Sequence, residues 1–172
     1  GTGTLFAAEM RMRAKGRWIA GAVASMRQSS RAAAAVLRGH GATACTDVTG
    51  FGLLGHLVEM TRASGVNVRL ALASVPVLDG ALETSAEGLL SSLHPHNVRL
   101  RRAVVDVERA ALDPRYPLLY DPQTAGGLLA GVPGDRADAC VDDLRAQGYA
   151  QAAVIGVVES RGDDAPIAIE LG

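Results

Sequence analysis

The sequence predicts an α+β or α/β layer fold in which helices cover one face of a sheet. Segments with helical and with strand periodicity alternate irregularly along the 172 residues, without an internal repeat or a low-complexity tract. Hydrophobic residues make up 48% and charged residues 20%, which is typical of a globular chain of one domain or two small ones. Because aromatic residues make up only 3%, the core must be built from Leu, Val, Ile and Ala.

The first half of the chain is expected to alternate strands with well-marked helices. Apolar residues at helical or alternate spacing, Ser and Thr caps and glycine stops define its segments. They are a short strand over Gly1–Ala8, a helix over Gly16–Gln28, a helix from Ser29 or Ser30 to Arg38, a strand over Ala42–Asp47, a helix over Phe51–Ala63 closed by Gly65, and a half-buried strand over Val66–Leu72.

The second half is less regular. Its proline and glycine residues mark the turns between short segments. We expect a helix over Leu78–Ser85, irregular chain over Gly88–Asn97, a helix over Arg99–Glu108, a loop at Asp113–Pro117, a strand over Gly127–Val132, a helix over Asp135–Gln147, and strands over Ala152–Glu159 and Ile167–Leu171 around a Gly162–Asp164 turn.

The segment Thr46–His56 reads Thr-Asp-Val-Thr-Gly-Phe-Gly-Leu-Leu-Gly-His and places one acidic side chain in a turn between a strand and a helix. An aspartate such as Asp47 can hold Mg²⁺ while waters and phosphate oxygens complete the shell. Thr49 can cap the following helix. Residue types alone favour the commoner role, in which Asp47 and Thr49 only turn and cap the chain.

A second segment, Asp121–Gly127, reads Asp-Pro-Gln-Thr-Ala-Gly-Gly. Successive backbone N–H groups in such a turn can bind an anion. A plain turn between strands, with glycine supplying positive φ, explains the same residues. The opening Gly1–Gly3 lacks the lysine of a phosphate-binding loop, and we interpret it as structural.

Three segments together resemble the C-terminal half of the selenophosphate synthetases. They are Gly1–Leu5, Thr46–His56 and Leu118–Leu129, and they follow the family's order. The resemblance runs over essentially the whole chain, and the two longer segments are the specific ones. One departure is Ala125, where many members carry serine, so that a hydroxyl contact to phosphate is missing there.

The resemblance implies the fold, the reaction and the ligands. The fold would be a mixed or antiparallel sheet covered by helices, as in the C-terminal domain of aminoimidazole ribonucleotide synthetase. Residues 1–172 would form the single C-terminal domain of a longer enzyme, a homodimer that converts selenide, ATP and water into selenophosphate, AMP and phosphate with Mg²⁺. The opening without an initiator methionine is likewise typical of mid-protein sequence.

Residue by residue, the resemblance implies one metal ligand. The family's aspartate at the position of Asp47 helps to hold the magnesium ions that bridge ATP phosphates, with Thr46 and Thr49 as support. Thr124, Gly126 and Gly127 are the expected cofactor-binding residues. The family's catalytic cysteine or selenocysteine, its lysine, its glycine-rich segment and its other metal aspartates belong to the N-terminal half. We therefore expect no catalytic residue in this chain and no synthetase activity from it alone.

The remaining reactive side chains are interpreted as structural. Both cysteines are expected to be buried small apolar residues, each histidine to be a packing or surface residue, and the arginine cluster to be a solvated helix face. A pair of histidines flanking a proline lacks a third metal ligand. These residues are Cys45, Cys140, His40, His56, His94, His96, Arg99, Arg101 and Arg102.

Charge and composition limit the classes of partner that the chain is expected to bind. The net charge of −1 gives no reason to expect a nucleic-acid surface, and no apolar run has the length of a membrane span. Two cysteines without paired spacing favour a reducing, cytoplasmic location. Two alternative functions stay open: a related ATP-using enzyme of the same superfamily with another acceptor, and an inactive scaffold or dimerisation module.

Overall fold

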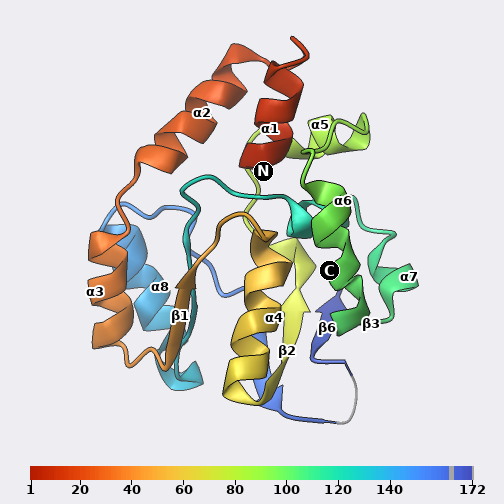
Figure 1. Cartoon of the computed structure of the whole chain (residues 1–172). Helices are drawn as coiled ribbons and strands as arrows, with labels where there is room; N and C mark the ends of the chain where they lie inside the picture. The colour runs from red at the N-terminus through yellow and green to blue at the C-terminus, as the bar shows by residue number, and fades with distance from the viewer. Residues whose placement is uncertain (163–164, 172) are drawn as a thin grey trace.

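The chain begins with a helix where the sequence predicted a strand. In the computed structural model, which describes residues 1–162 and 165–171, α1 spans Thr2–Glu9 and packs against both α2 (Gly16–Arg27) and α5 (Ala81–Ala86). Because α1 is buried on several sides, its apolar residues follow neither period, and the strand prediction for Gly1–Ala8 is wrong. These three helices surround Trp18 and form the upper end of the molecule in Figure 1.

Two separate sheets carry the strands. The sheet that matters for the site pairs β1 with β4 in antiparallel fashion, and the second is a mixed sheet in the order β3-β6-β2-β5. The strands are β1 (Ala44–Asp47), β2 (Val66–Ala71), β3 (Val104–Val105), β4 (Leu128–Gly131), β5 (Gly156–Ser160) and β6 (Ile167–Glu170).

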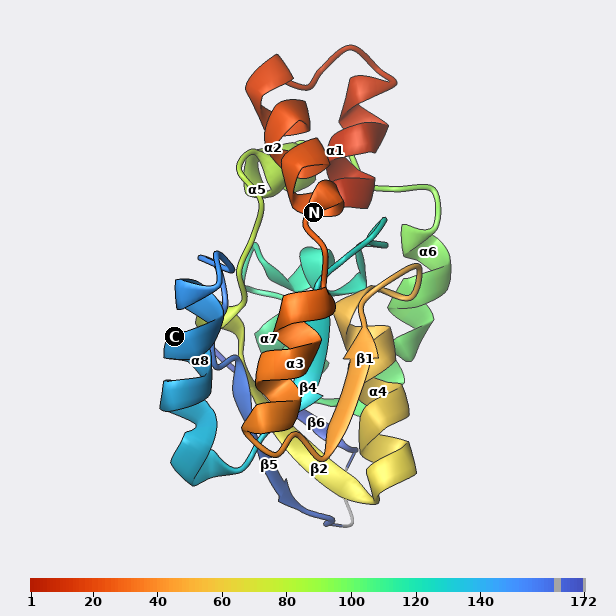
Figure 2. The same cartoon turned by 90° about the vertical axis from the view of Figure 1, so that its left-hand side faces the viewer.

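Helices cover these sheets, which confirms the predicted α+β class. α4 (Gly52–Ser64) contacts both β1 and β2, and α3 (Arg31–Gly39) packs against α8 (Ala137–Ala146) and β4 (Figures 1 and 2). The short helices are α6 (His94–Asn97), α7 (Val107–Ala110) and the 3₁₀ turns η1 (Leu72–Ser74), η2 (Val98–Ala103), η3 (Tyr116–Tyr120) and η4 (Gly134–Arg136).

Most predicted segments are confirmed to within a few residues. Gly65 directly follows α4 and adopts the left-handed conformation that lets a chain leave a helix, with φ of 64°. β2 alternates as expected, with Val68 and Leu70 buried and Arg69 exposed. Two turn residues of the last predicted turn, Asp163 and Asp164, lie outside the described residues.

The helix predicted over Arg99–Glu108 is wrong. The segment divides into η2, the two-residue strand β3 and the start of α7. The break occurs because Val104 and Val105 pair in parallel with Ile167 and Ala168 of β6, and this distant pairing overrides the local helical pattern.

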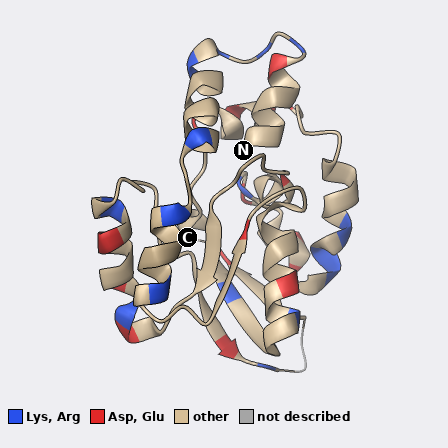
Figure 3. Ribbon diagram, turned by 60° about the vertical axis from the view of Figure 1, so that its left-hand side comes forward, with Lys and Arg blue, Asp and Glu red and all other residues tan. Residues whose placement is uncertain are grey.

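The apolar core follows from Leu, Val, Ile and Ala together with two tyrosines. Its largest cluster lies between α4, the four-stranded sheet and η3, and includes Leu54, Leu70, Tyr120 and Ile167. Charged residues of both signs are interspersed along the outer helices in the view of Figure 3. Within the described residues, no helix combines the length and the apolar character needed to cross a bilayer.

Candidate functional site

The pairing of β1 with β4 brings the two longer sequence motifs together. Asp47, the last residue of β1, lies opposite Leu128, the first residue of β4. Beyond this pair the two loops stay in contact, because the backbone N–H of Gln123 donates to the carbonyl of Thr49 at 3.0 Å. The loops Val48–Phe51 and Asp121–Gly127 therefore lie side by side, with Asp47 at their junction.

Gly126 is required by the closeness of these loops. A Cβ atom added to Gly126 would lie 2.1 Å from the carbonyl oxygen of Val48, far inside van der Waals contact. The neighbouring Gly127 accepts a hydrogen bond from the Val48 N–H at 2.9 Å, but a Cβ on Gly127 would meet nothing within 4 Å. The two glycines thus have different roles, and only Gly126 permits the close approach.

The Asp47 carboxylate is exposed to solvent and makes no hydrogen bond or ion pair with any described residue. Within residues 1–162 and 165–171, no group of three His, Cys, Asp or Glu side chains could hold a metal ion. One carboxylate cannot form a protein cage, but it does suit Mg²⁺, which keeps waters and takes substrate phosphate oxygens as further ligands. The residues present therefore fit part of a magnesium site.

The second loop contains backbone N–H groups that have no partner among the described residues. The N–H of Thr124 donates to the Thr2 hydroxyl at 3.0 Å, so it is already used, and the Thr124 side chain is exposed. The N–H groups of Ala125, Gly126 and Gly127 make no hydrogen bond with the described residues. Ala125 has a positive φ of 48°, which is uncommon for a residue with a Cβ. This short run of free donors is suited to oxygen atoms of an anion.

The opening segment anchors the second loop, as its structural interpretation predicted. Asp121 is fully buried and accepts a 2.7 Å hydrogen bond from the Thr4 hydroxyl and one of 3.1 Å from the Gln123 side chain. The N–H of Gly3 donates to the Pro122 carbonyl at 3.0 Å. Residues far apart in sequence therefore hold the second loop in place.

His56 supports the first loop. Its buried Nε2 accepts a 3.0 Å hydrogen bond from the Thr49 N–H, so the ring proton belongs on Nδ1, which lies 3.5 Å from the Glu59 carboxylate. Thr49 therefore pairs with His56 and does not cap α4, whose N-cap residue is Phe51. The capping role predicted for Thr49 is wrong, because Thr49 lies two residues before the N-cap and hydrogen-bonds to the side chain of His56.

The cysteines divide between buried and exposed positions. Cys140 is buried, as predicted, but Cys45 is exposed, so its predicted burial is wrong. Cys45 and Asp47 are two residues apart on β1 and share its solvent-facing side. Local desolvation, and secondly the negative charge of Asp47, raise the pKa of the Cys45 thiol above its ordinary value.

The other histidines and the arginines have structural surroundings. His40 lies 2.8 Å from the Asp143 carboxylate, and His96 is exposed. The ring of His94 packs edge-on against Tyr120, with 5.9 Å between centroids. The three clustered arginines, Arg99, Arg101 and Arg102, are exposed on η2.

One residue outside every motif bridges the first loop and the residue directly before the second loop. Asn97, in the stretch predicted to be irregular, is buried at the end of α6. Its side-chain amide donates to the carbonyls of Gly50 and Tyr120, at 2.8 and 3.0 Å. A single asparagine carries no spacing signal, so nothing in the sequence pattern could have revealed this contact.

Comparisons with known proteins identify the family. A family model described as AIR synthase related protein, C-terminal domain, matches residues 4–169. The chain is 42% identical to a protein named selenide, water dikinase from Pelobacter propionicus, over 79% of this chain and 39% of that protein. It is 39% identical to one from Clostridioides difficile, over 69% of this chain and 34% of that protein. The chain thus spans well under half the length of these curated relatives.

Solved structures show the same fold. The hydrogenase maturation protein HypE superposes with a TM-score of 0.61 at 24% identity, over 86% of this chain and 40% of that one. HypE in complex with ATP superposes with a TM-score of 0.53 at 24% identity, over 76% of this chain and 33% of that one. These matches confirm the predicted fold class, and the curated relatives confirm the resemblance to selenophosphate synthetases.

Proposed function

Because the chain belongs to the AIR synthase related proteins, in their C-terminal domain family, we propose that it is the C-terminal domain of an ATP-dependent selenophosphate synthetase. The longer enzyme would convert selenide, ATP and water into selenophosphate, AMP and phosphate. The names of the curated relatives, selenide, water dikinase, support this reaction over that of other superfamily members.

The observation that carries the proposal is the position of Asp47. Its unpartnered carboxylate stands at the junction of the two loops. Asp47 pairs with Leu128, the first residue of β4, which directly follows the free N–H groups of Ala125–Gly127. A carboxylate for a cation and N–H donors for an anion at one place suit a magnesium–phosphate group.

Each residue would act in a simple way. Asp47 would supply one oxygen to Mg²⁺, which neutralises charge on the phosphate oxygens during transfer. Gly126 and Gly127 would present backbone N–H groups to phosphate oxygens, and the exposed Thr124 hydroxyl would add a donor that Ala125 lacks. His56 would orient the first loop through the Thr49 N–H without touching the nucleotide.

The rest of the longer enzyme would complete the site. An open, mainly apolar cavity of about 1150 Å³ includes Val154, Val157 and Val158, all exposed, among its lining residues. Apolar surface of this extent favours contact with further protein. We propose that residues 1–172 are one domain whose missing partner half holds the nucleophile and most of the ATP, within a cytoplasmic homodimer, and that this chain alone is inactive.

The test uses the full-length protein that carries this chain. Phosphorus NMR follows ATP and selenide with wild type, Asp47→Asn, and Asp142→Asn as a matched control from the exposed side of α8. We expect a selenophosphate signal and AMP from wild type and the control, and neither from the Asp47 variant. Retained signal in a folded Asp47→Asn protein would remove Asp47 from the site.

The same experiment addresses the other superfamily reactions. If folded wild type gives no selenophosphate, the proposed reaction is wrong, and the acceptors of the sister ATP-using enzymes are tested next. If ATP raises the melting temperature but no acceptor reacts, a nucleotide-binding scaffold replaces the synthetase proposal.

A further inference from the structure

Asn97 connects the first motif loop to Tyr120, the residue directly before the second loop. Asn97 is only 7% exposed, and its Nδ2 lies 2.8 Å from the Gly50 carbonyl oxygen and 3.0 Å from that of Tyr120. A primary amide has two N–H bonds, so each of the two carbonyls can receive one. A side chain with both donors committed in this way restrains the distance between the first loop and the residue from which the second loop starts.

The contact also fixes a peptide orientation. Since the peptide is planar and trans, a Gly50 carbonyl that points at Asn97 directs the N–H of Phe51 the opposite way. The N–H of Phe51, the residue before α4, makes no hydrogen bond within the described residues. Asn97 thereby leaves the N–H of Phe51 in the first loop free to bind a ligand.

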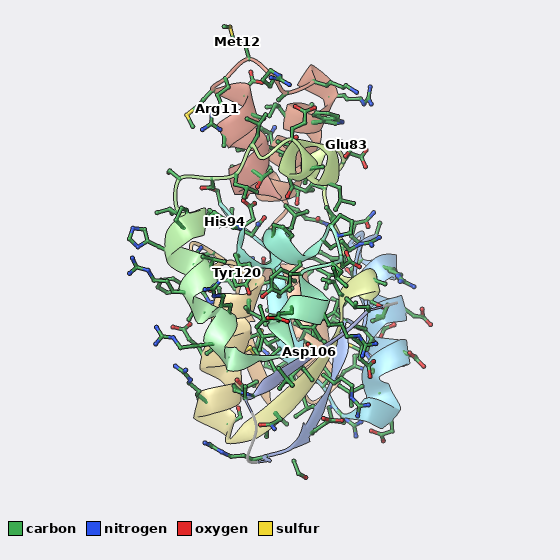
Figure 4. The ribbon with its side chains drawn as sticks, turned by 90° about the vertical axis from the view of Figure 1, so that its right-hand side faces the viewer. Arg11, Met12, Glu83, His94, Asp106 and Tyr120 are labelled. Carbon is green, nitrogen blue, oxygen red and sulfur yellow. The ribbon has the colours of Figure 1, made fainter. Side chains whose placement is uncertain are left out.

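Aromatic packing holds Asn97 in place. The ring of His94, at the other end of α6, packs on Tyr120 with an interplanar angle of 78° (Figure 4). Tyr120 in turn is fully buried, packs edge-on against Tyr116 and shares a hydroxyl hydrogen bond with it. Burial, reinforced by this bond, raises the pKa of Tyr120 above its ordinary value, so Tyr120 stays neutral. The residue whose carbonyl Asn97 contacts is thus buried and packed against two rings.

We propose that Asn97 is a positioning residue that holds the loops Val48–Phe51 and Asp121–Gly127 in the arrangement required to bind magnesium–ATP. The inference rests on the proposed function. Asn97 touches neither the metal nor the nucleotide; it acts through the two carbonyls. Preorganised loops bind their ligand without first having to be ordered, so loosening them weakens binding.

The informative change is Asn97→Asp in the full-length protein, because it keeps the shape and replaces the donors with an oxygen facing two carbonyl oxygens. We expect the KM for ATP to rise on the order of tenfold while kcat changes much less, the pattern of lost ground-state positioning. Asn97→Ala, which removes the donors without repulsion, serves if the aspartate variant fails to fold.

Two controls separate positioning from general stability. Asn67→Asp makes the same chemical change at the chain's other asparagine, on β2, and is expected to leave the KM unchanged. Val68→Ala weakens the core below the sheet and is expected to lower the melting temperature without raising the KM. If Val68→Ala raises the KM as much as Asn97→Asp does, the effect is one of stability, and the proposal is overturned.

The outcomes also separate this inference from the proposed function. Active wild type with an unchanged KM in both Asn97 variants overturns the role of Asn97 alone. If wild type makes no selenophosphate, the reaction is wrong, and amide hydrogen exchange decides the role of Asn97 in holding the loops. Faster exchange of the Gln123 N–H, which donates to Thr49, in Asn97→Asp but not in Asn67→Asp supports that role. Equal exchange contradicts it.

Discussion

Replacing Gly126 by alanine tests the close approach of the two loops. The added Cβ would lie 2.1 Å from the Val48 carbonyl oxygen, whereas real Cβ contacts essentially never fall below 3.0 Å. The loops must therefore separate by roughly 1 Å, the amount by which the contact is too short. Forced overpacking of this kind costs about 1–3 kcal/mol. A loss of about 2 kcal/mol corresponds to a fall of about 4–8 °C in melting temperature for a chain of this size.

Gly127→Ala is the matched control, because its Cβ would meet nothing within 4 Å. Urea and thermal unfolding of wild type and both variants, followed by circular dichroism, measure the difference. We expect Gly126→Ala to be clearly destabilised and Gly127→Ala to stay within about 0.5 kcal/mol of wild type, as surface changes do. If the two variants were equally stable, the close approach of Gly126 to Val48 would not be a real constraint.

Three further changes test other contacts. His56→Ala removes the acceptor of the Thr49 N–H and should lower the free energy of unfolding by about 1–3 kcal/mol, measured in urea. An unchanged free energy of unfolding would contradict the hydrogen bond. Asp47→Asn removes a charge that raises the pKa of Cys45, so this thiol should titrate at lower pH and react faster with iodoacetamide near neutral pH; an unchanged pH–rate profile would rule out the coupling. Thr4→Val leaves the buried carboxylate of Asp121 short of a donor and should cost about 1.5–3 kcal/mol by the same urea assay; a stability equal to wild type would show that the bond contributes nothing.

Local patterns located most of the scaffold around the site. The helix ending at Gly65 and the strand carrying Val68 and Leu70 have the clear periodicity of elements with one buried face. α1 lacked such a pattern because it is enclosed by two other helices. β3 was missed because its two valines pair with β6, which comes much later in the chain. The residues next to β3 in the sequence do not indicate this pairing.

The same reasoning explains what was found and missed at the site. The sequence motifs singled out Asp47 and the Asp121–Gly127 loop as candidates, and the pairing of β1 with β4 brings these candidates together. The exposure of Cys45 was missed because a short apolar run does not reveal which face of a two-stranded sheet meets solvent. Asn97 was missed because its role depends on where two carbonyls lie in space, and residue spacing does not encode this.

The position of β6 has a consequence for biosynthesis. β6 occupies an inner place in its sheet, in parallel register with β2 on one side and β3 on the other. The ribosome makes β2 and β3 long before it makes Ile167, so a nascent chain carries these two strands without β6, which pairs with both. Until then their unpaired edges are open to other chains. Synthesis interrupted upstream of Ile167 would therefore release a chain prone to aggregate, with the candidate site already translated but its supporting sheet incomplete.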